Sequence, residues 1–345
     1  MPTAGTTAAV TPQGAPIWLG LLTLYLVWGS TYLAISYAVE TIPPFLMAGV
    51  RFLSAGLLLL AWSVARDGRT FVPPTRREWR DSAIVGSLLI GGGMGMVAFG
   101  EQTVPSGIAA LLIAVMPVWV AVLGRIVFGE RLPRLALVGV VVGFAGVAVL
   151  IGPSAFGGTG AFEPVGLAAI LVSPLAWASG SLFASHRATL PARPLVATGV
   201  QMTVGGSLLL VMGVVTGELG AFRLELVSPA SVIALLYLTI VGSLIAYTTY
   251  GWMLTVAPLP LVATYAYVNP VIAVILGFLV AGEVIEPRTL LAGAVIVFAV
   301  ALIVTARGRM PSPRRTSSPE AGRSAPEDRL RSLPARPVPP DAPSP

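Results

Sequence analysis

Three polar side chains that could bind a ligand or carry a proton lie within, or directly after, long apolar segments. Arg51 stands in AGVRFLSAGLLLL, Glu101 follows an apolar run in FGEQTVPSG, and Asn269 precedes Pro270 in YVNPVIAV. A guanidinium group can hold an anion, a carboxyl group can exchange a proton, and an amide can both donate and accept hydrogen bonds. Charged and polar groups are costly inside a membrane, so each of these needs a partner or a function.

Arg51 has two interpretations. Arg51 lies about 10 Å below the outer membrane boundary, counted from the start of its predicted helix at 1.5 Å per residue. At this depth its guanidinium can reach toward the lipid head groups by snorkelling. It is either a packing arginine bonded to carbonyls of a loop or a neighbouring helix, or a direct contact for an anionic substrate group. The matching position in the second half of the chain is Gln201. Because an amide can imitate a packing hydrogen bond but not a counter-charge, we favour a structural role for both residues.

Glu101 is the acidic residue with the clearest route to proton coupling, because it ends an apolar run beside Gln102. Desolvation there would raise its pKa toward the range in which a carboxyl group exchanges protons near neutral pH. The alternative is a solvated loop glutamate at the membrane surface.

Glu130 and Glu283 occupy matched positions, and each is followed by a proline that suits the first turn of the next helix. A site that serves one face of the membrane would not be duplicated on the other face. We therefore interpret both glutamates as structural residues at helix starts.

Pro117 and Pro270 are predicted to lie inside helices, where each leaves a carbonyl, of Ile113 or Ala266, without its usual donor. Freed carbonyls in a membrane must find another partner and therefore favour the side facing a cavity. A packing kink is the favoured role for both prolines. For Asn269, bonding to such a carbonyl and bonding to a ligand stay equally open.

Aromatic side chains could form the walls of a binding cavity, since ring faces hold apolar or cationic groups. Trp28 with Ser30, and Trp177 with Ser179, are matched pairs and the first candidates for opposite walls. Others could instead be anchors at the membrane interface. The further candidates are Tyr32, Trp119, Tyr247 and Tyr265.

The elements that must position these side chains are membrane-spanning helices. Hydrophobic residues make up 55% of the chain and charged residues 10%. We find ten apolar runs of about the 20 residues that a helix needs to cross a bilayer. The predicted spans are 17–37, 45–65, 83–100, 107–128, 135–152, 164–184, 195–215, 231–251, 260–281 and 289–306.

Arginine placement predicts the orientation. The chain has 21 basic residues, all arginine, and ten lie in loops on one predicted side against two on the other. The positive-inside rule then predicts a multi-pass protein of the cytoplasmic (inner) membrane with both termini in the cytoplasm. The tails 1–16 and 307–345 are predicted to be disordered. The second tail is basic and rich in proline, and we expect it to contact anionic membrane lipid rather than nucleic acid.

The chain repeats itself. AGVRFLSAGLLLL at 48–60 corresponds to TGVQMTVGGSLLL at 198–210, and WGSTYL at 28–33 corresponds to WASGSL at 177–182. MPVWVAVLGRIVFGE and NPVIAVILGFLVAGE, which begin at Met116 and Asn269, correspond as well. Each unit has five crossings, and since five is odd the second unit enters from the opposite side of the membrane. The sequence therefore predicts an all-α integral membrane protein: two inverted five-helix repeats, 17–152 and 164–306, around a central cavity.

These repeated motifs resemble the EamA family of the drug/metabolite transporter superfamily, of the bacterial metabolite or drug exporter type. The resemblance implies a cavity lined by helices 1, 3 and 4 and their counterparts 6, 8 and 9. It also implies alternating access and a small-molecule substrate such as an amino acid, a related metabolite or a drug. It does not identify the substrate.

Other functions are less well supported. The chain has no cysteine, one histidine and no glycine loop with a lysine for phosphate, so we expect no enzyme activity, cofactor or metal site. A passive channel or facilitator stays open, and a membrane receptor is a weaker alternative because no folded output domain is evident. A coupled proton and a homodimer are also left open by the sequence.

Overall fold

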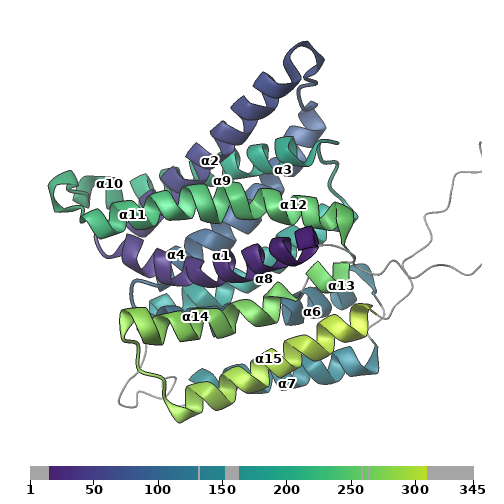
Figure 1. The fold of residues 1–345 in the computed structure, drawn as a ribbon, viewed down its shortest axis with the longest axis vertical. Coiled ribbons are helices and arrows are strands. Elements are labelled where there is room, and N and C mark those ends of the chain that lie inside the picture. The colour runs from purple at the N-terminus through teal and green to yellow at the C-terminus, as the bar shows by residue number, and fades with distance from the viewer. Residues whose placement is uncertain (1–14, 131–132, 152–162, 258, 263, 309–345) are drawn as a thin grey trace, which may run out of the picture. The chain divides into compact units, whose positions relative to one another are not determined.

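The computed structural model describes residues 15–130, 133–151, 163–257, 259–262 and 264–308, and the described chain is helical (Figure 1). Most of the predicted tails, residues 1–14 and 309–345, lies outside the described residues. Eight helical segments within the described part are long and apolar enough to cross a membrane, and Arg134–Leu150 and Tyr265–Ala281 are shorter apolar helices. Together they account for the ten predicted spans.

Several spans consist of more than one helical segment. In chain order the segments are α1 (Ala15–Val39), α2 (Pro44–Asp67), α3 (Arg76–Gly86), η2 (Ser87–Met94), α4 (Gly95–Gly100), α5 (Ser106–Ile113), α6 (Met116–Phe128), α7 (Arg134–Ile151), α8 (Pro164–His186), α9 (Pro194–Val215), α11 (Pro229–Tyr237), η5 (Leu238–Ile245), α12 (Ala246–Val256), α13 (Leu259–Val262), α14 (Tyr265–Ala281) and α15 (Pro287–Gly308). Short turns of helix, η1 (Gly68–Thr70), α10 (Glu218–Ala221) and η4 (Leu224–Leu226), lie in the connections.

Local sequence explains where these helices begin and end. Five of them, α2, α8, α9, α11 and α15, begin with a proline, which lacks the amide hydrogen that a first turn cannot use. Both α6 and α14 end at a glycine with positive φ, Gly129 (66°) and Gly282 (67°). The helices therefore stop at matched places in the two repeats.

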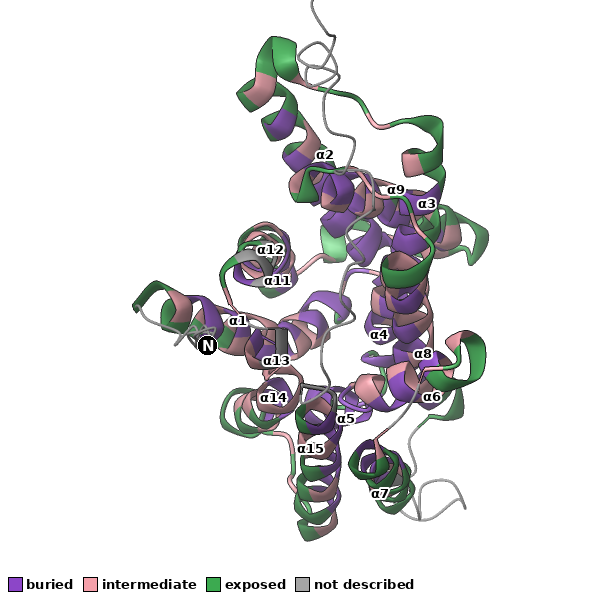
Figure 2. Ribbon diagram, turned by 90° about the vertical axis from the view of Figure 1, so that its right-hand side faces the viewer, coloured by how far each residue is buried: buried purple, intermediate pink, exposed green. Residues whose placement is uncertain are grey.

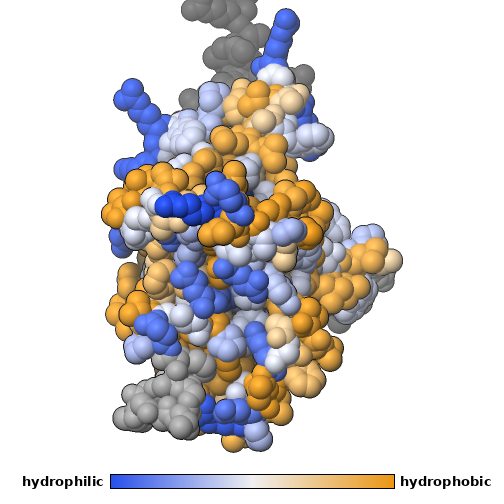
Figure 3. All heavy atoms as spheres, turned by 90° about the vertical axis from the view of Figure 1, so that its left-hand side faces the viewer, coloured by the Kyte–Doolittle hydropathy of each residue, from blue (hydrophilic) through white to orange (hydrophobic). Residues whose placement is uncertain are grey.

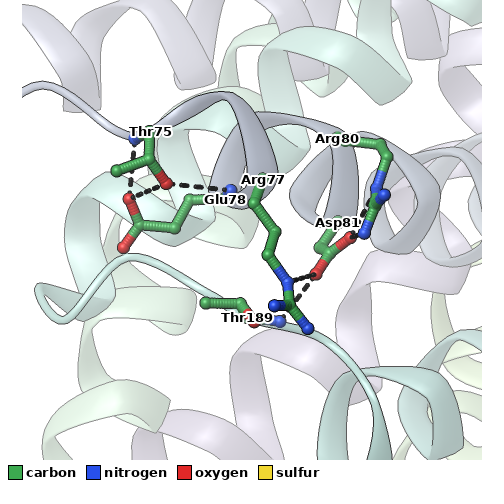
Figure 4. A network of polar contacts seen from close by, with 6 residues as sticks. All are labelled: Thr75, Arg77, Glu78, Arg80, Asp81 and Thr189. Carbon is green, nitrogen blue, oxygen red and sulfur yellow. Dashed lines mark hydrogen bonds and ion pairs between the residues drawn. The ribbon is translucent and has the colours of Figure 1, made fainter.

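A polar network fixes the start of α3 (Figure 4). Thr75 and Glu78 form a capping box, in which each side chain accepts from the other residue's amide. One turn later the Asp81 carboxylate accepts from the Thr189 amide at 2.8 Å and from the Arg80 guanidinium at 2.8 Å. Asp81 thus joins α3 to the connection that follows α8.

The two repeats interlock, so that each helix packs mainly against helices of the other repeat. Counterparts pair directly, α2 along α9 and α7 along α15, while α1 packs on α14 as α8 packs on α6 (Figures 1 and 2). Small residues allow the close approach of α2 and α9: a Cβ added to Gly56 would lie 2.5 Å from the Thr203 nitrogen. These main contacts between the repeats therefore occur in inverse pairs, as expected of a duplicated and inverted unit.

Both repeats also contain a π-helical segment at the same place in the third span, η2 in the first repeat and η5 in the second. A π-helix widens the turn, disturbs the regular backbone ladder and is common near functional sites. Its residues lie beside the centre of the molecule, because η2 packs on α8 and η5 packs on α1 and α2.

Apolar side chains cover much of the outside of the helices. Leu57, Trp62, Val211, Leu279 and Phe298 are each more than half exposed, as expected for side chains that face lipid. Figure 2 shows exposed residues on the outward sides of the helices and buried ones between them. In Figure 3, hydrophilic side chains gather along the middle of one helix-end face, with hydrophobic ones at both sides.

Candidate functional site: a central cavity

A cavity of about 110 Å³ lies between the two repeats. Its walls come from the predicted helices 1, 3, 4, 6, 8 and 9, and also from α2. The lining residues are Trp28, Thr31, Tyr32, Ile35, Arg51, Met94, Val97, Ile113, Met116, Ser173, Pro174, Trp177, Tyr247, Tyr265 and Asn269.

Six predicted binding candidates line this cavity, and five do not, among them Glu101, which is described below. Trp28, Tyr32, Trp177, Tyr247, Tyr265 and Asn269 are in the lining. The matched serines lie outside the lining and form hydrogen bonds elsewhere. The Ser30 hydroxyl lies 2.6 Å from the Tyr237 hydroxyl, and the Ser179 hydroxyl donates to the Leu175 carbonyl. Trp119 packs edge-on against Phe144, and Gln102 is exposed.

An aromatic cluster around Trp28 forms one wall. The Trp28 ring centroid lies 4.9 Å from that of Tyr265, 5.5 Å from that of Tyr247 and 5.3 Å from that of Tyr250. Aromatic pairs at these separations stabilise one another beyond their buried area. The cluster joins α1 of the first repeat to α12 and α14 of the second, so the wall is shared between the repeats.

Arg51 is only 2% exposed and lies in the cavity lining, so its guanidinium does not reach the head groups by snorkelling. Its Nε donates to the Ser243 hydroxyl at 2.9 Å, and its Cζ lies 4.5 Å from the centroid of the Phe52 ring. The neighbouring-helix bond that we expected is therefore present, but to a hydroxyl in η5 and not to a carbonyl.

Asn269 faces both the central cavity and an adjoining one of about 60 Å³. Its Oδ1 is buried and accepts no hydrogen bond within the described structure. Pro117 and Pro270 line the adjoining cavity. Pro270 lies inside α14, as predicted. Pro117 lies in the fourth predicted span, in the first turn of α6 and directly after a break in the helix at Ala114 and Val115.

Glu101 lies in the turn 101–105, between the spans that end at Gly100 and begin at Ser106. It is 5% exposed, and neither carboxylate oxygen has a hydrogen-bond partner in the described structure. It does not line the cavity, although Val97, one helical turn earlier, does. Burial raises the pKa of Glu101 well above its usual range, the Glu283 charge raises it further and the Arg51 charge lowers it. The alternative of a solvated loop glutamate does not match this burial.

Glu283 has a structural role, but at a different helix from the one that we expected. Its carboxylate accepts from the Ser106 amide at 2.7 Å, the Ser106 hydroxyl at 2.6 Å and the Gly107 amide at 3.0 Å. It therefore caps α5 of the first repeat and not α15, which follows it in sequence. A carboxylate at this end also matches the positive end of the helix dipole.

The counterpart Glu130 lies at the other end of the molecule, where its carboxylate is 3.0 Å from His186 Nε2. His186 stacks on Phe128 with ring centroids 4.2 Å apart. Gln201, the counterpart of Arg51, is in α9, and its backbone packs closely against Gly86 of α3. Neither Glu130 nor Gln201 lines the cavity.

Sequence reasoning missed Ser173 and Pro174, which lie together in the lining on α8. The signal was present, because a proline inside a long apolar run indicates a local break in the helix. It also missed Met94 and Val97, which follow the run of glycines at 91–93. The glycines indicated close helix packing there, but nothing in the sequence indicated the π-helical turn.

The model of the EamA-like transporter family matches residues 16–152 and 164–305. The chain is 39% identical over 301 residues to the uncharacterized inner membrane transporter YedA of Escherichia coli strain K12, covering 87% of this chain and 94% of YedA. It is 27% identical over 294 residues to a Salmonella typhimurium protein named "Probable amino-acid metabolite efflux pump", covering 81% of this chain and 91% of that protein.

A solved crystal structure of a protein has the same fold. It superimposes with a TM-score of 0.58 at 20% identity, and the match covers 86% of this chain and 99% of the other.

Proposed function

Because the chain belongs to the EamA-like transporter family, a family of membrane transporters and not of enzymes, we propose that it exports small organic metabolites or drugs. Transport is secondary and proceeds by alternating access around the central cavity. The exporter direction is supported by the similarity to a protein named as an efflux pump. The membrane is the cytoplasmic (inner) one, with both termini in the cytoplasm, as the arginine distribution favours.

One observation carries this proposal: the cavity is enclosed by both repeats, and its aromatic wall is shared between them. Trp28 of the first repeat contacts Tyr247 and Tyr265 of the second. A movement of one repeat against the other must therefore change the cavity walls themselves. Inverted repeats supply two related arrangements of similar energy for such a movement.

The test is uptake of labelled amino acids and drugs into inside-out membrane vesicles, with and without an acidic interior. We expect saturable uptake, with Trp28→Ala raising KM or abolishing uptake. Trp119→Ala is the matched control, because Trp119 lies off the cavity against Phe144. Uptake that never saturates would indicate a passive channel, and equal effects of the two substitutions would refute this cavity as the transport site.

Dependence on the imposed proton gradient decides whether protons are coupled to transport. Glu101→Gln extends the test to the buried carboxyl group. Gradient-driven uptake that is lost in this variant would support coupling through Glu101. Uptake indifferent to both the gradient and the substitution would indicate a facilitator.

A further inference from the structure

The guanidinium of Arg51 has unused binding capacity. An arginine side chain carries five N–H donors, and the described structure provides a hydrogen-bond acceptor for Nε alone, the Ser243 hydroxyl. The residue is 2% exposed, so bulk water does not supply the missing acceptors. A buried cation with most of its donors unused is costly unless something else binds it.

None of the described lining residues carries a carboxylate that could accept hydrogen bonds from the Arg51 guanidinium. Arg51 is the charged residue among the lining residues, and no salt bridge to Arg51 is found within the described structure. The acidic residue whose charge acts on Arg51 is Glu101. It lies outside the lining, and its carboxylate has no hydrogen-bond partner within the described structure. The positive charge in the cavity is therefore incompletely balanced by the protein.

The rest of the lining suits the body of an organic molecule rather than an inorganic ion. Trp28, Trp177 and Tyr265 present aromatic surface, and Met94, Val97, Ile113 and Met116 present aliphatic surface. An inorganic anion would leave these surfaces without contacts. A small molecule with a carboxylate at one end and an apolar body at the other would contact both kinds of wall.

We propose that the central cavity binds small organic carboxylates, with the carboxylate on the unused N–H donors of Arg51 and the apolar body against Trp28 and Trp177. Arginine is suited to this because its planar fork matches two carboxylate oxygens at once. The assignment names the substrate class of the transport site and therefore rests on the proposed function.

The protonation state of Glu101 changes the affinity of this site for a carboxylate. Its charge acts on Arg51, as does the Tyr247 hydroxyl group. The charges of Glu283 and Arg51 act in turn on Glu101, and Glu101 acts on the Tyr32 hydroxyl group. When Glu101 is ionised it partly satisfies Arg51 and competes with a bound carboxylate. When it is protonated, Arg51 is left uncompensated and binds the carboxylate more tightly. Affinity therefore rises as pH falls through the pKa of Glu101, which burial raises.

The experiment is a binding titration on the full chain in lipid nanodiscs with three probes that share one ring: phenylacetate, phenylacetamide and phenethylamine. We expect phenylacetate to bind at least tenfold more tightly than the neutral amide or the cationic amine. Amide or amine binding as tight as that of phenylacetate in the wild type would overturn the proposal. This comparison needs no variant, so a misfolded mutant does not affect it.

Arg51→Gln then tests the residue, and it introduces the side chain that the second repeat carries at Gln201. We expect it to abolish the preference for phenylacetate, whereas Arg223→Gln, an exposed arginine in the connection after α10, leaves the preference unchanged. A folded Arg51→Gln protein that still prefers phenylacetate would overturn the assignment. Folding is checked by the thermal unfolding midpoint of each variant.

The pH dependence tests Glu101. At every pH at which phenylacetate stays ionised, we expect Glu101→Gln to bind it with constant, high affinity, whereas the affinity of the wild type rises as pH falls. A profile that is flat in the wild type, or unchanged in the variant, would refute the role of Glu101.

The outcomes separate this proposal from the proposed function. Selective phenylacetate binding without any vesicle uptake would support the site and argue against transport. Saturable transport of cations or neutral compounds, with no preference for the acid, would support transport and overturn the carboxylate site.

Discussion

The cap that Glu283 places on α5 is the contact between repeats whose removal has the clearest expected effect. Glu283→Gln keeps the shape of the side chain but replaces one carboxylate oxygen by an NH₂ group. Whichever way the amide turns, this NH₂ faces an N–H donor of Ser106 or Gly107, because both oxygens accept from the start of α5. The remaining hydrogen bonds become weaker, because their acceptor is then a neutral amide oxygen instead of a charged carboxylate oxygen.

The magnitude follows from these three hydrogen bonds. Each bond to a charged group contributes about 1.5 to 3 kcal/mol, whereas a neutral bond contributes about 0.5 to 1.5 kcal/mol. With one bond lost, two weakened and the sum not additive, we expect a destabilisation of about 2 to 4 kcal/mol. At about 2 °C per kcal/mol for a chain of this length, the unfolding midpoint falls by about 4 to 8 °C.

The assay is thermal unfolding of the purified protein in detergent, with Glu286→Gln as the matched control. Glu286 lies three residues further along the same connection, and its carboxylate pairs with Arg288 at 3.6 Å while 60% exposed. An exposed pair of this kind contributes about 0 to 1 kcal/mol. Equal midpoints for the two variants would show that the cap does not stabilise the contact between the repeats.

Three further substitutions test other contacts by the same unfolding assay. Gly56→Ala places a Cβ 2.5 Å from backbone of α9 and should destabilise by about 1 to 3 kcal/mol, whereas Gly220→Ala, with open space around it, should have little effect; equal effects would contradict close packing of α2 on α9. Thr75→Ala removes the helix cap of α3 and should destabilise by about 1 kcal/mol, so an unchanged midpoint would contradict the capping box. Burial raises the pKa of Glu218, so the folded state holds the proton of this carboxyl group more tightly than the unfolded state does. The wild type should therefore lose stability relative to Glu218→Gln as pH rises from about 4 toward 7. Parallel profiles of stability against pH would contradict this.

The architecture could be predicted from sequence because its determinants are local and repeated. Apolar runs of bilayer length gave the spans, and the match of the Arg51 and Gln201 segments, with five crossings in each unit, gave the inversion. The prolines and glycines at helix ends then placed boundaries to within a few residues, except that α3 begins seven residues before its apolar run and α12 ends five residues after its own. These signals depend on chemistry that each residue carries in any context.

The cavity could be predicted only in part because lining depends on rotation about each helix axis. Repeat matching identified Trp28 and Trp177 correctly as candidates that lie in the lining, yet the same argument chose Ser30 and Ser179, which point elsewhere. The wider turns of η2 and η5 change which side chains face inward, and no residue pattern marked them. The contact of Glu283 with α5 joins positions 177 residues apart and has no local signal at all.

The unequal residues at positions 51 and 201 give the two halves of this duplicated protein different electrical properties. Arg51 places a fixed positive charge inside the membrane on α2, and α9 has no counterpart to it. An elementary charge that crosses the whole membrane at 100 mV changes the free energy by about 2.3 kcal/mol, so a displacement through a tenth of the field changes it by about 0.2 kcal/mol. Any rearrangement that moves Arg51 along the membrane normal is therefore electrogenic. Under the alternating access that we propose, the transmembrane voltage then biases the protein toward one access state, even with an uncharged substrate.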